Sequence, residues 1–176
     1  MATTYELISS SVLTATTQSV TFSSIPQTYT DLVLRLSYRT SASGLFGSNP
    51  AIRFNADATS NYSYTNVDGN GTSASSTQEV DINALYMQSS DSAGNTADTF
   101  TSTEVYIPNY TGTAKKPISI FKAAEQNATA AEMHVFASLY EGTSAISTIL
   151  IGPSSNIVSN NFVTGSSFYL YGIKNS

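Results

Sequence analysis

The feature that most constrains the fold of this chain is a two-residue alternation of apolar and polar side chains over residues 31–39. Side chains two residues apart in an extended strand point to the same face, so the pattern predicts a strand with one buried face. The buried face would carry Leu32, Leu34, Leu36 and Tyr38, and the other face Val33, Arg35, Ser37 and Arg39. Pro26 cannot donate a ladder hydrogen bond, so residues 25–29 are predicted to be a turn or an extended lead-in.

Further short segments are predicted to be strands: 5–8, 19–22, 51–55, 78–87, 100–107, 117–123, 133–140, 144–151 and 167–173. Clusters of Gly, Asn, Ser and Asp, which favour turns, separate many of them. The predicted loops are 41–50, 67–76 and 89–98. Short strands with such punctuation indicate an all-β sandwich or barrel. A chain of 176 residues suits one domain, so a single domain over 1–176 is predicted.

Residues 129–141 fit two periods. Helical spacing connects Met133, Phe136, Ala137 and Tyr140. Strand spacing connects Met133, Val135, Ala137 and Leu139. The pattern alone leaves both alternatives open, and the neighbouring strands favour the strand. The loop at 67–76 is rich in Gly and Ser with few apolar anchors, which predicts that it is the most mobile part of the chain.

The polar residues are unusual, because only 11% of the chain is charged while Ser and Thr make up about 30%. The formal net charge of −5 disfavours nucleic-acid binding, which requires clustered Lys and Arg. Lys115-Lys116, the one adjacent basic pair, is interpreted as part of a solvated loop. The chain has no Cys, which excludes disulfides and thiolate metal sites.

Candidate catalytic residues are few, since the chain has one His and no Cys. His134 lies between Met133 and Val135 and is predicted to be structural. The motifs G-x-S-x-G, G-x-x-x-x-G-K-[ST] and G-x-G-x-x-G do not occur. Sugar cleavage would need two paired carboxylates, and the scattered acids include Asp57, Asp68, Asp81 and Glu104. We therefore predict a protein that is not an enzyme, with no catalytic, cofactor or metal site.

The segment Asp68-Gly69-Asn70-Gly71-Thr72 places side-chain oxygens at alternate positions, as calcium loops do. Glu79 stands at the twelfth position from Asp68, where an EF-hand carries its bidentate Glu. Thr72 replaces an acid, however, and Ser73 holds the position of the required glycine. A plain turn is the favoured interpretation.

Eleven Tyr and no Trp supply many rings with one apolar and one polar end, a combination suited to wet interfaces. Most of these rings are predicted to lie in the core or in cross-strand pairs. Tyr62 and Tyr64 stand beside predicted loops, and for them contact with a partner is the less favoured alternative to a core role.

No apolar run approaches the roughly 20 residues that span a bilayer. The first seven residues lack a basic segment followed by an apolar one, so no secretory signal is expected there. We expect synthesis in a host cytoplasm, and a final position outside a cell would then be reached by assembly into a larger particle.

Several segments resemble small β-rich virion proteins of tailed bacteriophages, and the likeness covers nearly the whole chain. They are 22–34 (FSSIPQTYTDLVL), 52–55 (IRFN), 60–63 (SNYS), 107–110 (IPNY) and 161–174 (NFVTGSSFYLYGIK). Members of that group usually carry Trp near the position of Tyr140. The resemblance implies a jelly-roll-like β-sandwich that acts as a head decoration (cement) protein or as part of a tail fibre. It implies no active-site residues, and it favours the strand at 133–140.

The leading functional hypothesis is a capsid decoration protein on the outer surface of the virion. It would bind the lattice of the major capsid protein or other virion proteins, as a homotrimer, without contacts to nucleic acid or membrane. The alternative is a tail-fibre or spike module that recognises a glycan of the host surface. A glycan-cleaving enzyme is a third, disfavoured class.

Overall fold

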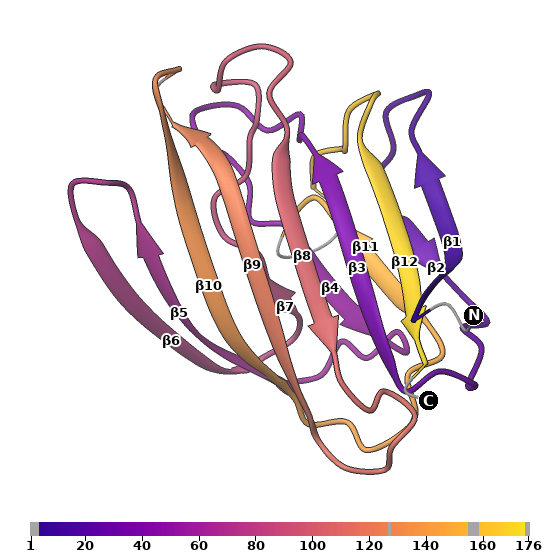
Figure 1. The fold of residues 1–176 in the computed structure, drawn as a ribbon. Coiled ribbons are helices and arrows are strands. Elements are labelled where there is room, and N and C mark those ends of the chain that lie inside the picture. Colours follow the sequence, from indigo (N-terminus) through magenta and orange to yellow (C-terminus); the bar gives the residue numbers. More distant parts are fainter. Residues whose placement is uncertain (1–3, 127, 155–158, 175–176) are drawn as a thin grey trace.

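The computed structural model describes residues 4–126, 128–154 and 159–174 and shows an all-β sandwich of two antiparallel sheets (Figure 1). The first three residues of the segment examined for a secretory signal therefore lie outside the described residues. The strands are β1 (Tyr5–Val12), β2 (Val20–Phe22), β3 (Asp31–Tyr38), β4 (Ala51–Phe54), β5 (Tyr62–Gly69), β6 (Ala74–Ile82), β7 (Leu85–Tyr86), β8 (Thr101–Ile107), β9 (Lys116–Gln126), β10 (Ala130–Tyr140), β11 (Ile149–Gly152) and β12 (Ser167–Ile173).

The two sheets differ in width. The large sheet has eight strands in the order β1-β12-β3-β8-β9-β10-β5-β6, and the small sheet has four in the order β2-β11-β4-β7. From β1 to β4 the chain passes from one sheet to the other at every step. The hairpins β5–β6 and β9–β10 lie wholly in the large sheet and widen it beyond the small one. The small sheet covers part of one face of the large sheet (Figure 1).

Strand β3 lies inside the large sheet and confirms the predicted alternation. Leu32, Leu34, Leu36 and Tyr38 are almost fully buried against the small sheet, whereas Arg35 and Ser37 are exposed on the other face. Val33 shares the outward face and is nevertheless buried. Its partners in register are Tyr171 on β12 and Tyr106 on β8, whose large rings flank it on both sides.

Aromatic rings fill both ends of the core. At one end Tyr38, Phe162 and Phe168 pack together, with ring centroids 4.9–6.4 Å apart. At the other end Phe54, Tyr62 and Tyr140 pack together, with ring centroids 4.9–6.2 Å apart. The hypothesis that Tyr62 and Tyr64 contact a partner is wrong, because their side chains are 1% and 2% exposed.

The predicted loop at 67–76 is wrong in its length. Strand β5 continues to Gly69 and β6 starts at Ala74, so the turn spans only four residues. The Asn70 side chain caps this turn by accepting hydrogen bonds from the backbone N–H groups of Thr72 and Ser73. The polar side chains of both strands hid the two-residue period, because β6 is an edge strand whose residues are mostly exposed.

Other predicted boundaries also change. The predicted strand 78–87 is divided between β6 and β7, and that at 144–151 is shortened to Ile149–Gly152. The ambiguous segment 129–141 is a strand, as favoured, and pairs with β9 and β5 over its length. The prediction of an all-β fold is confirmed. Of the two predicted architectures, sandwich and barrel, the structure adopts the sandwich.

Two corners of the sandwich depend on hydrogen bonds of a polar side chain, Asp31 at one corner and Asn55 at the other. Asp31 begins β3 and accepts hydrogen bonds from the Tyr106 hydroxyl (2.8 Å) and the Asn109 backbone N–H (2.7 Å). Asn55, at φ 52°, follows β4 and holds the segment before β11 through Ser147 and Ala145. These contacts give structural roles to the segments 22–34, 52–55 and 107–110.

The alternation in β3 generates a stability prediction. Leu34 is fully buried beside Leu170 and Val105, so Leu34→Ala leaves a cavity and should lower the free energy of unfolding by about 3 kcal/mol. Ser37→Ala, on the exposed face of the same strand, should change it by about 0.5 kcal/mol or less. Urea unfolding followed by circular dichroism measures both, and equal losses would contradict the assigned faces.

Candidate functional site

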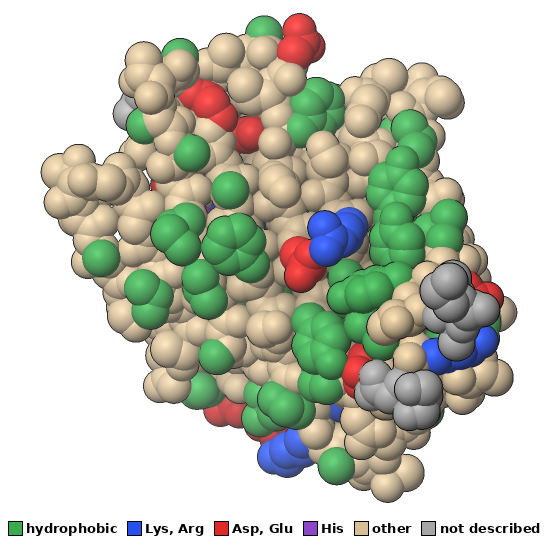
Figure 2. Space-filling view, viewed as in Figure 1, with side chains coloured by type: hydrophobic (Ala, Val, Ile, Leu, Met, Phe, Trp, Pro, Cys, Tyr) green, Lys and Arg blue, Asp and Glu red, His purple; other side chains and the backbone are tan. Residues whose placement is uncertain are grey.

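The outward face of the large sheet, opposite the small sheet, is the broadest surface that the fold leaves uncovered. One row of side chains crosses it in register, from strand to strand: Tyr169 (β12), Arg35 (β3), Glu104 (β8), Phe121 (β9), Val135 (β10) and Val67 (β5). Hydrophobic side chains gather at both ends of this face, with a basic and an acidic group between them (Figure 2). The row therefore runs from an aromatic end through an ion pair to an apolar end.

The apolar end, here called the apolar patch, consists of Phe121, Met133, Val135 and Val67 on three adjacent strands. Their exposed fractions are 53%, 47%, 44% and 54%. The outward positions of β10 and β5 carry no charged side chain; they are Ala131, Met133, Val135, Ala137 and Leu139 on β10, and Ser63, Thr65, Val67 and Gly69 on β5. Single exposed apolar residues are ordinary, whereas these four lie next to one another on adjacent strands.

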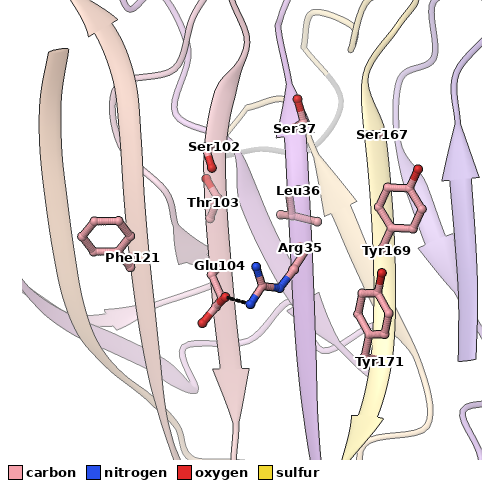
Figure 3. Close-up of a pocket in the computed structure, with 10 residues that line it drawn as sticks. All are labelled: Arg35, Leu36, Ser37, Ser102, Thr103, Glu104, Phe121, Ser167, Tyr169 and Tyr171. Carbon is pink, nitrogen blue, oxygen red and sulfur yellow. Dashed lines mark ion pairs between the residues drawn. The ribbon is translucent and has the colours of Figure 1, made fainter. Parts of the chain in front are cut away.

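The other end of the face is hollowed into an open depression of about 570 Å³, here called the trough. Tyr169 and Tyr171 of β12 form one side, and Phe121 of β9 stands at the other (Figure 3). Between them Arg35 Nη2 lies 2.6 Å from Glu104 Oε2. Both charged side chains are largely exposed, at 61% and 45%, so water screens the pair and it adds little to stability. The pair instead fixes one donor group and one acceptor group on the floor of the trough.

A further apolar strip lies on the edge strand β1, where Tyr5, Leu7 and Val12 are 54%, 52% and 57% exposed. In the large sheet β1 pairs with β12 alone, so its outer edge is open. Together with the patch and the trough, this strip makes the outward face apolar at both margins.

A separate polar cluster lies inside the sandwich. Lys122, fully buried on the inward face of β9, donates a hydrogen bond from Nζ to the Ser89 carbonyl oxygen. Next to it in register is His134, whose Nε2 is 2.8 Å from Glu132 Oε1. Burial lowers the pKa of Lys122 to about 7, although the negative charges of Glu132, Asp91 and Asp68 oppose this shift. Burial likewise raises the pKa of Asp91.

Two of the predicted candidates for chemistry are neighbours, because His134 on β10 is in register with Asp68 on β5. The others lie at separate places. His134 is 3% exposed, in agreement with a structural role. Asp57 accepts hydrogen bonds from Thr59 and Asn61 at one corner, while Asp68 accepts one from Ser75 inside the β5–β6 hairpin. Asp81 lies on β6 at φ 55°, and Glu104 pairs with Arg35.

Two further sequence interpretations were tested. The suspected calcium segment is only partly a turn, because Asp68 and Gly69 end β5 and Asn70, Gly71 and Thr72 lie in the turn that follows. The described residues contain no group of three or more His, Asp or Glu suited to a metal ion. The solvated-loop interpretation of the lysine pair holds for Lys115 only. Lys116 is 2% exposed, and its Nζ donates to the carbonyl oxygens of Ala114 (3.0 Å) and Gly142 (3.2 Å).

Sequence reasoning did not find the outward face as a site. Its row joins residues from six strands, and nothing in the local pattern says which strands are neighbours. Within the part of the chain that is described, no helix has the length and hydropathy of a membrane span. Comparison with protein-family models, with curated proteins and with solved structures finds no match to this chain.

The buried lysine generates a pH prediction. Between its pKa of about 7 in the folded chain and its usual value of 10.5, unfolding takes up a proton, so Lys122 makes stability rise with pH across that window. In Lys122→Met this contribution disappears. The unfolding free energy of the wild type minus that of the variant should therefore increase between pH about 7 and 9, by at most about 1.4 kcal/mol per unit.

Urea unfolding at several pH values measures that difference. Lys115→Met is the matched control, because Lys115 is exposed and its salt bridge to Glu141 lies at the surface. A difference for Lys122→Met that stays constant with pH would contradict the prediction.

Proposed function

We propose that this chain is a non-enzymatic structural protein of a bacteriophage virion, which decorates the head by binding the lattice of the major capsid protein. The observation that carries the proposal is the apolar patch of Phe121, Met133, Val135 and Val67 on an uncovered sheet. Burying this patch against another protein removes apolar surface from water at little cost, because the outward positions of β10 and β5 hold no charge to desolvate.

The sandwich is suited to a role as a rigid attachment. Its core is continuous from the Tyr38 cluster to the Tyr62 cluster, so the outward face is held by packed side chains behind it. A protein that binds the assembled shell, and not its free subunits, shifts the assembly equilibrium toward the shell by mass action. The low proportion of charged residues and the resemblance to small virion proteins support the same role.

We also propose the jelly-roll form of the sandwich. The orders β1-β12-β3-β8 and β2-β11-β4-β7 support it. Once the hairpins β5–β6 and β9–β10 are set aside, successive strands alternate between the sheets except at β4 and β7, which pair with each other in the small sheet. The proposed assembly is a homotrimer at junctions between coat subunits, positioned on the outer surface of the particle.

The absence of catalysis is part of the proposal. The chain's one His is buried, and its Nε2 is engaged by Glu132. The Arg35–Glu104 pair in the trough has both charges satisfied by one another, which suits a binding surface more than acid–base chemistry.

The docking role predicts the effect of a charge in the apolar patch. Val135→Asp would place an unpaired carboxylate in the interface, so binding to assembled shells that lack this protein should weaken at least about tenfold. Co-sedimentation of the full chain with such shells measures the loss.

Thr21→Asp is the control, since Thr21 is exposed on the outward face of the small sheet. It should bind as the wild type does. If Val135→Asp binds as the wild type does and Thr21→Asp does not bind, the docking surface lies on the small sheet. That result would contradict the proposal.

A further inference from the structure

The trough differs in chemistry from the apolar patch beside it. Tyr169 and Tyr171 lie on the same face of β12, with ring centroids 6.4 Å apart and planes inclined by 22°. Figure 3 shows the two rings one after the other along the strand, with their faces toward the viewer. They form a nearly continuous aromatic platform whose hydroxyl ends remain accessible. A flat platform of this kind accepts flat apolar surface and offers hydrogen bonds at its rim.

Polar groups line the rest of the trough in two rows. Arg35 and Glu104 hold the middle row beside Tyr169. The second row lies two residues further along the same three strands. It consists of Ser167, Ser37 and Ser102, which are paired in register across β12, β3 and β8. Each hydroxyl both donates and accepts, Arg35 donates and Glu104 accepts. The trough therefore presents many short polar contacts beside one aromatic wall.

This combination matches the chemistry of a sugar. A pyranose ring has an apolar C–H face, which packs on an aromatic ring, and a rim of hydroxyls, each of which donates and accepts. Because Arg35 is already neutralised by Glu104, the trough has no net charge to attract an acidic ligand. A neutral sugar fits both the rings and the ion pair without leaving a charge unpaired.

We propose that the trough is a binding site for neutral oligosaccharides, with pyranose rings on Tyr169 and Tyr171 and sugar hydroxyls on Arg35 and Glu104. The trough shares Phe121 with the apolar patch, whereas Val135, Met133 and Val67 of the patch do not line it. Since the depression is open to solvent, one site binds weakly, with a dissociation constant of about 0.1–1 mM.

The test is titration of the full chain with neutral hexasaccharides, namely β-1,4-glucan, β-1,4-mannan and α-1,4-glucan oligomers, and with an acidic polygalacturonate hexamer. Binding is followed by two-dimensional NMR. At least one neutral oligomer should bind, and Tyr169→Ala and Tyr171→Ala should each weaken it at least about tenfold. Tyr169→Phe, which keeps the ring, should retain most of the affinity.

Tyr5→Ala is the matched control, because Tyr5 is exposed on the edge strand β1 and does not line the trough. Val135→Asp should bind the sugar as the wild type does, although it should bind shells weakly. The sugar site and the docking surface can therefore fail independently in these tests. The site is overturned if no neutral hexamer binds at about 10 mM, if both Tyr→Ala variants bind as the wild type, or if only the acidic hexamer binds.

Discussion

The mismatch in width between the two sheets determines the surface of this protein. Eight strands are hydrogen-bonded in one sheet and four in the other, and the alternation of side chains turns every second residue of the large sheet away from the small one. Most side chains at those outward positions reach solvent, although Val33 is buried between Tyr171 and Tyr106. In β3 and β8 they hold Arg35 and Glu104, in β12 two tyrosines, and in β9, β10 and β5 apolar side chains. The arrangement of one sheet thus produces both the trough and the apolar patch.

The part of the fold that depends on local pattern was predictable. Leu32, Leu34, Leu36 and Tyr38 alternate without interruption because β3 has one apolar face against the small sheet. Both a helical and a strand period fitted the residues of β10. The neighbouring strands favoured a strand, and the structure confirms it. His134, which stands between apolar residues in the sequence, is buried, at 3% exposure.

What depends on register between distant segments was not predictable. The Gly- and Ser-rich residues 69–73 hid a hairpin whose edge strand β6 is mostly exposed. Tyr62 and Tyr64 stand beside polar residues in the sequence, yet β5 turns both rings into the core against Tyr140 and Phe136. The ion pair joins residues 35 and 104, and the trough adds residues 169 and 171. No local period indicates that these strands are neighbours.

The central claim is that the outward face of the large sheet, and not the small sheet, attaches the protein to a virion. A reconstruction of whole particles that carry this chain tests it most directly, because it locates the subunit and the sheet that meets its neighbour. The account predicts density on the head, with β9, β10 and β5 turned toward the coat lattice. Density confined to the tail, or a shell contact made by β2, β11 and β4, would contradict it.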